Sequence, residues 1–182
     1  MAVLDTGIYP HSDLQGRIRG FRDYIRQRQQ PYDDNGHGTH ISGIIGAGGK
    51  GAVHGVAPGC YLQGYKVLDK NGNGKILDIC QAVEDIMKYN QNHAQRSGLS
   101  IYLSVCGNGC GQNCSNVFYE VWSRRGIRGL LFWQQPEIMA RREYCDQPGV
   151  SKKIITVGSL DTINERKREP SLYSGRGPTE SC

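Results

Sequence analysis

Short apolar runs alternate along this chain with segments of helical periodicity, and this alternation constrains the fold more than any other feature. Residues 1–4 form a wholly apolar run, and residues 61–68, 99–105 and 153–158 are further runs that favour strands. Helical spacing of apolar residues follows His37, where a first helix is expected, and marks residues 117–124 as another. The strongest helical pattern comprises Ile76, Ile79, Cys80, Val83, Ile86 and Met87. Strands that alternate with helices predict an α/β fold with a parallel sheet covered on both faces.

Two stretches of the chain carry no such pattern. Residues 10–30 are polar and broken, with Tyr24 and Ile25 as candidate anchors, and residues 46–55 are rich in glycine. Both are expected to be irregular, and the glycine-rich stretch to be a loop.

Length and charge exclude several classes of protein. The 182 residues suit one domain, and a net charge of +5 is too small and too scattered to favour a nucleic-acid binder. No run approaches the roughly 18 to 20 apolar residues of a membrane span, so no membrane partner is expected. No secretory signal precedes Ala2, which leaves two compartments open: the cytoplasm, or secretion with the start of the chain missing.

The seven cysteines do not indicate a metal centre. Their number is odd, so they cannot all pair within the chain. Cys106, Cys110 and Cys114 recur every four residues, but this is not a paired Cys-x-x-Cys pattern and no histidine lies nearby. We therefore expect no metal ligands here.

Asp5 and His37 are the candidate catalytic residues. Asp5 follows the first apolar run, at the end of a strand where parallel sheets place their functional groups. His37 opens a helix and lies between glycines, which let the backbone pass close to a substrate. A carboxylate beside an imidazole can hold it in one tautomer and stabilise its protonated form, as in a Ser-His-Asp system.

Two blocks of this sequence resemble the subtilisin-like (peptidase S8) serine proteases: residues 2–8 (AVLDTGI) and residues 34–43 (DNGHGTHISG). Shorter runs at residues 55–58, 66–68, 154–159 and 173–179 are similar to family segments and occur in the same order. The resemblance implies a doubly wound parallel sheet, with residues 1–182 forming a partial peptidase domain truncated at its C-terminal side. It also implies a serine endopeptidase that cleaves extended polypeptides.

The resemblance assigns roles to individual residues. Asp5 would orient His37, and His37 would act first as general base and then as general acid. Two segments would pair with the backbone of a polypeptide substrate from opposite sides. They are Gly72, Asn73 and Gly74 on one side, and Ser104, Val105 and Cys106 on the other, with Cys106 in place of a glycine typical of the family.

The sequence departs from the family pattern where the remaining chemistry is expected. The family nucleophile lies in a Gly-Thr-Ser segment, and this sequence contains none. Gln135 falls where the family carries the asparagine that stabilises the oxyanion, and its longer side chain would be misplaced. Losing such a donor costs about 10²–10³ in turnover. We therefore expect this chain to be inactive, or nearly so, by itself.

One hypothesis accounts for an aberrant segment at about residues 129–145. Residues 136–141 (PEIMAR) can be encoded by CCG GAA ATA ATG GCC CGG, which reads Gly-Asn-Asn-Gly-Pro when started two nucleotides later. A local frameshift would thus hide the missing asparagine motif. A codon other than ATA at Ile138 would exclude this reading.

Several alternatives to an ordinary protease stay open from the sequence. The chain could be a pseudoprotease that binds peptides without cleaving them, one piece of a split protease completed by a missing C-terminal fragment, or a gene remnant. No cofactor is expected. Calcium occurs in the family, but residues 46–55 lack the asparagine-rich loop that supports a tight calcium site, so no strong site is expected there.

Overall fold

The computed structural model describes residues 1–50, 53–93, 99–103, 130–133, 155–157, 160–161 and 169–170. The chain divides into two compact units, Met1–Tyr102 and Leu103–Cys182. We call them the first and second units and describe each by itself. Asp5 and His37 both lie in the first unit.

A parallel sheet forms the centre of the first unit. Its strands stand in the order β2-β3-β1-β4. Their bounds are β1 (Ala2–Asp5), β2 (Ile18–Asp23), β3 (Leu62–Lys66) and β4 (Ile101–Leu103). Strand β1 pairs in parallel with β3, from Ala2 beside Gln63 to Asp5 beside Lys66, and β2 pairs in parallel with the other edge of β3. On the far side of β1, the amide of Ala2 donates to the carbonyl of Ser100 at 2.7 Å.

This strand order places Asp5 at a topological switch point. The chain builds β2 and β3 on one side of β1 and then crosses to place β4 on the other side. Ligands of open α/β sheets bind outside the carboxyl ends of strands at such a point. Asp5 is the last residue of β1 and therefore lies at this edge.

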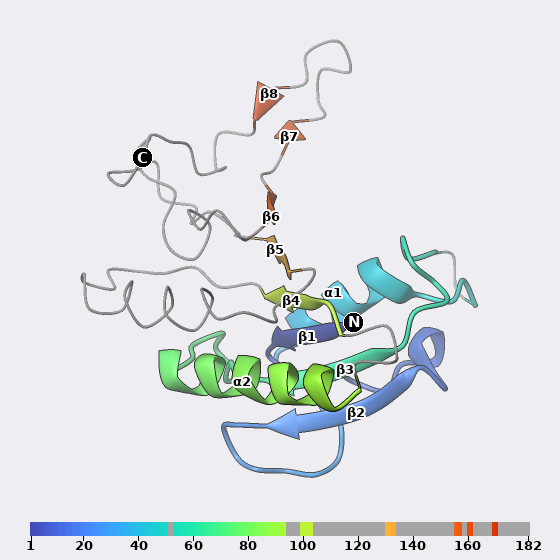
Figure 1. The fold of residues 1–182 in the computed structure, drawn as a ribbon. Coiled ribbons are helices and arrows are strands. Elements are labelled where there is room, and N and C mark those ends of the chain that lie inside the picture. Colours follow the sequence, from blue (N-terminus) through green and yellow to red (C-terminus); the bar gives the residue numbers. More distant parts are fainter. Residues whose placement is uncertain are drawn as a thin grey trace. The chain divides into compact units, whose positions relative to one another are not determined.

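Helices cover both faces of this sheet. The helices are α1 (His37–Gly46) and α2 (Ile76–Asn92), and a short 3₁₀ helix, η1, spans Ser12–Leu14. In Figure 1, α2 lies in front of the strands and α1 behind them. All four residues of β1 are buried, as expected for a strand covered on both faces. The predicted doubly wound α/β fold is confirmed.

The predicted elements of the first unit are largely confirmed, with one strand missed. Helix α2 buries the predicted residues Ile79, Cys80, Val83, Ile86 and Met87, although Ile76 is only half-buried. Strand β2 occupies part of the segment expected to be irregular. As an outer strand of the first unit it exposes Arg19 and Arg22, so its sequence carries too few apolar residues to predict a strand.

In the second unit, β5 (Leu130–Trp133) pairs in parallel with β6 (Ile155–Val157). Strand β7 (Leu160–Asp161) pairs antiparallel with β8 (Glu169–Pro170). The strand predicted over residues 153–158 is confirmed by β6. The predicted helix at residues 117–124 lies outside the described residues, as does most of the segment at 129–145.

Candidate active site

The structure brings Asp5 and His37 together, as the sequence analysis expected. Nδ1 of His37 lies 2.9 Å from Oδ1 and 3.0 Å from Oδ2 of Asp5. The Asp5 side chain is fully buried, whereas that of His37 is 33% exposed. A carboxylate can only accept hydrogen bonds, so Nδ1 must donate and the neutral ring keeps its proton there. Nε2 of the neutral ring is thereby left as the basic nitrogen.

The backbone around Asp5 fixes the carboxylate. The amide of Thr6 donates to Oδ1 of Asp5 at 2.7 Å, and the amides of Val67 and Leu68 donate to its carbonyl oxygen at 3.0 and 3.2 Å. The buried carboxylate requires partners such as the Thr6 amide and Nδ1 of His37, because an unpaired one is costly to remove from water, and the Val67 and Leu68 amides fix the backbone that carries it. In this pair, Asp5 is therefore rigid and buried, and His37 reaches the surface.

Asp33 anchors the start of α1, and the sequence analysis did not find it. Its Oδ2 accepts from the amide and the hydroxyl of Thr39 at 2.9 and 2.6 Å. Its Oδ1 accepts from the hydroxyl of Thr6 at 2.9 Å and from the amides of Asn35 and Gly36 at 3.1 and 2.9 Å. Asp33 thus joins the segment after Asp5 to the first turn of the helix that carries His37.

The charge of Asp33 is stabilised by these contacts. Burial alone would raise the pKa of its carboxyl, but hydrogen bonds from Thr39, Gly36 and Asn35 outweigh burial and lower the pKa. An ionised carboxylate beside the free amides of a first helical turn also favours the helix. A sequence signal existed, since Asp and Asn are common just before helices, but it does not identify which amides a side chain will reach.

Glycines let α1 approach the end of β1. A Cβ on Gly38 would overlap the carbonyl oxygen of Gly7 and lie 3.1 Å from Cβ of Asp5. The amide of Gly38 donates to the hydroxyl of Thr6 at 3.0 Å. The absence of a side chain at Gly38 is therefore what allows His37, the neighbouring residue, to reach Asp5.

Gly72, Asn73 and Gly74 form an exposed loop after β3. Gly72 has a φ of +82°, which is not extended. The amide of Asn73 donates to Oδ1 of Asp69 at 2.9 Å, and its carbonyl accepts from the amide of Asp69 at 2.7 Å. Backbone hydrogen bonds from Asn73 and Asn71 lower the pKa of Asp69. The backbone amide and carbonyl of Asn73 are thus both bonded to Asp69 within the loop.

The other predicted site residues are not placed by the structure relative to Asp5 and His37. Ser104, Val105, Cys106 and Gln135 lie outside the described residues. Their roles stay predictions.

Among the described residues, no three His, Cys, Asp or Glu side chains gather as a metal site would require. No helix in that part of the chain combines the length and the apolar character needed to cross a bilayer.

The expectation of no strong calcium site at residues 46–55 can be tested by thermal unfolding. An ion that binds only the folded state raises Tm as its concentration rises. We predict that Tm is the same in millimolar calcium and in excess chelator. A Tm that climbs with calcium concentration would contradict the prediction.

Comparisons with known proteins agree with this architecture. The model of the subtilase family (Peptidase_S8) matches residues 1–181. Serine protease AprX of Bacillus subtilis (strain 168) is 38% identical over 98% of this chain and 42% of its own length. Minor extracellular protease Epr of the same organism is 41% identical over 46% of this chain and 13% of its own length. The solved structure of S41 psychrophilic protease is similar with a TM-score of 0.78 and 28% identity, covering 99% of this chain and 59% of that one.

The fold and the family model together define the class: this chain belongs to the subtilase family of subtilisin-like serine proteases. It spans less than half the length of AprX and about three fifths of the S41 structure.

Proposed function

We propose that this chain supplies the acid–base half of a serine endopeptidase. The observation that carries the proposal is the pairing of Asp5 with Nδ1 of His37 at 2.9 and 3.0 Å, at the carboxyl end of a central strand. Asp5 orients the ring and stabilises the imidazolium that forms during the reaction. Nε2 of His37 takes the proton of an attacking serine and returns it to the leaving amine.

The serine would come from outside the 182 residues, because no Gly-Thr-Ser occurs in them. Without a nucleophile next to the imidazole, covalent acyl transfer is unavailable. The chain alone is therefore inactive in this proposal.

The substrate class is an extended polypeptide. Relatives of this chain are named proteases, and proteases act on polypeptides. Gly72, Asn73 and Gly74 would pair with one side of the substrate backbone, and Ser104, Val105 and Cys106 with the other. Gln135 would stand at the oxyanion position, where its length would weaken stabilisation of the tetrahedral intermediate. The name of Epr favours secretion over the cytoplasm for this chain.

Complementation tests this proposal. The chain is mixed with a polypeptide that carries the Gly-Thr-Ser segment of a subtilase, and hydrolysis of a fluorogenic peptide is followed. Each piece alone should show no turnover, and the mixture should show turnover that is lost when the supplied serine is changed to alanine. A mixture that forms a complex yet never cleaves the peptide would count against the proposal.

A second candidate, peptide binding without cleavage, is favoured by the absence of Gly-Thr-Ser. It would apply if the chain by itself bound extended peptides tightly and the complemented mixture left them intact.

A further inference from the structure

Lys66 is a fully buried cation next to the Asp5–His37 pair. It ends β3, directly beside Asp5 in the strand register, and its side chain is 0% exposed. Buried ammonium groups are rare and need partners for all three N–H donors. A lysine here needs an explanation, because the two residues that follow it, Val67 and Leu68, are buried and apolar.

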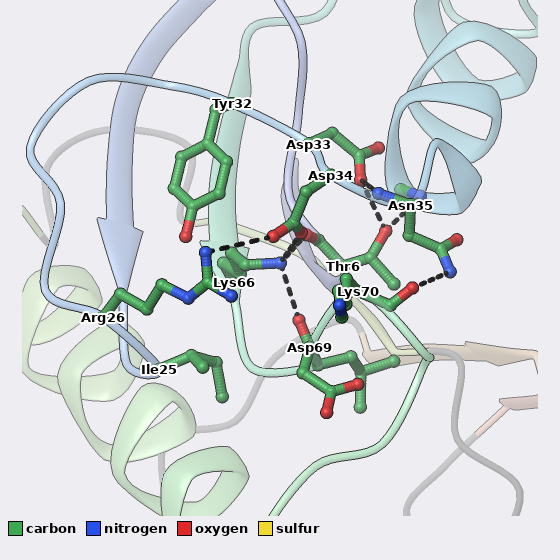
Figure 2. Close-up of polar contacts among 12 residues, drawn as sticks. Thr6, Ile25, Arg26, Tyr32, Asp33, Asp34, Asn35, Lys66, Asp69 and Lys70 are labelled. Atoms are coloured by element: carbon green, nitrogen blue, oxygen red, sulfur yellow. Dashed lines mark hydrogen bonds and ion pairs between the residues drawn. The ribbon is translucent and has the colours of Figure 1, made fainter.

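Three oxygens surround the ammonium of Lys66. Nζ donates to Oδ1 of Asp34 at 2.7 Å, to the carbonyl of Leu68 at 2.9 Å and to the carbonyl of Thr6. Figure 2 shows Lys66 between Asp34 and Thr6, with the ring of Tyr32 to one side. That ring lies 5.2 Å from Nζ, within the range of a cation–π contact.

The three acceptors belong to three separate segments of the chain. Thr6 follows Asp5, Asp34 precedes His37 by three residues, and Leu68 lies just after β3. Lys66 therefore ties the end of β1 to the segment that enters α1. An apolar side chain could fill the same space but could not hold these segments to one another.

Asn35 makes a second link between the same segments. Its Oδ1 accepts from the amide of His37 at 3.1 Å, and its Nδ2 donates to the carbonyl of Lys70 at 2.9 Å. Figure 2 shows the contact between Asn35 and Lys70 beside the Lys66 cluster. A displacement of Asp34 would therefore be passed to the backbone of His37 through its neighbour Asn35.

We propose that Lys66 is a positioning residue: its ammonium holds Asp34 and the Thr6 carbonyl so that His37 meets Asp5 at hydrogen-bond distance. The inference rests on the proposed role of that pair. Misplacement of a catalytic group by about 1 Å can cost about 10²-fold in rate. Holding His37 in place can therefore outweigh the free-energy cost of burying the Lys66 ammonium. Arg26 also approaches Asp34, but at 3.7 Å and with a side chain 47% exposed, so it is not required for positioning.

The test uses the Nδ1–H proton of His37, which can be observed without any nucleophile. In the chain labelled with ¹⁵N-histidine, an Nδ1–H that donates to a buried carboxylate gives a downfield proton signal protected from exchange with water. Lys66→Met removes the charge and keeps most of the length of the side chain. We expect this variant to lose the signal at a temperature where circular dichroism shows it folded. Arg26→Met is the matched control and should keep it.

A double variant separates positioning from simple stability. Lys66→Met leaves Asp34 with the longer, exposed contact to Arg26 in place of the buried ammonium, and Lys66→Met with Asp34→Asn removes the carboxylate charge as well. We expect the double variant to regain much of the lost Tm but not the His37 signal. If Lys66→Met does not fold, Asp34→Asn alone carries the test, with exchange of the His37 proton expected to speed up about tenfold or more.

Two results would overturn the proposal: a His37 signal unchanged in Lys66→Met or in Asp34→Asn, or full return of the signal in the double variant. If the proposed protease function is wrong but the role of Lys66 is right, the results differ. The His37 signal is then lost in Lys66→Met as expected, and the complemented mixture shows no turnover.

Discussion

Replacing His37 with alanine should lower the kcat of the complemented protease by about 10⁴-fold or more. Asp5 orients the ring of His37 so that Nε2 is its basic nitrogen, and an alanine leaves the serine hydroxyl without that acceptor for its proton. The measurement is the rate of fluorogenic peptide hydrolysis at saturating substrate, with the serine supplied by the second polypeptide. KM should change far less than kcat, because the imidazole acts in the transition state.

His40→Ala is the matched control for that experiment. His40 lies in the same helix, one turn beyond His37, and is exposed. Exposed positions away from caps and networks usually tolerate substitution within about 0.5 kcal/mol, so the rate should stay within about twofold. Equal losses in the two variants would show that the helix, and not the imidazole at position 37, had been damaged.

Gly38→Ala should be among the most destabilising single changes in the first unit. The new Cβ would overlap the carbonyl oxygen of Gly7, a backbone atom that cannot rotate away, and would lie 3.1 Å from Cβ of Asp5. Overpacking of this kind costs about 3 kcal/mol or more when the obstacle is fixed. Urea unfolding followed by circular dichroism should show a lower midpoint at an unchanged slope.

Gly43→Ala, in the same helix, should stabilise the protein where Gly38→Ala destabilises it. No heavy atom outside the local helix backbone lies within 4 Å of a Cβ built there. Alanine should therefore stabilise α1 by about 0.5–1 kcal/mol through its higher helix propensity. Similar effects of the two substitutions would mean that α1 does not approach β1 as closely as described.

The elements predicted from the sequence are those whose burial leaves a clear pattern. Strand β1 is buried on both faces and is apolar up to its last residue, Asp5, and α2 buries one face at helical spacing. Strand β2 was missed because it is partly exposed and carries arginines. Local pattern cannot show that a polar segment is held in place by pairing with β3.

The candidate site was predictable only in part, for a related reason. Asp5 and His37 lie in motifs whose residue types and spacing by themselves predict a carboxylate–imidazole pair. Lys66 acts through partners far away in the sequence, and Asp33 joins nearby amides to the distant hydroxyl of Thr6. No local feature shows that Lys66 will be buried against Asp34. An ordinary surface lysine would have the same sequence context.

The most direct test of this account is to follow the Nδ1 proton of His37 in the chain alone, before and after Asp5→Asn. His37→Gln identifies the signal among the five histidines. We predict a protected, downfield Nδ1–H in the unchanged chain that disappears in Asp5→Asn, because an asparagine can present its amide nitrogen to the ring and favour the other tautomer. A chain that lacks this proton, or that keeps it unaltered without the Asp5 carboxylate, would contradict the pairing on which the proposed function depends.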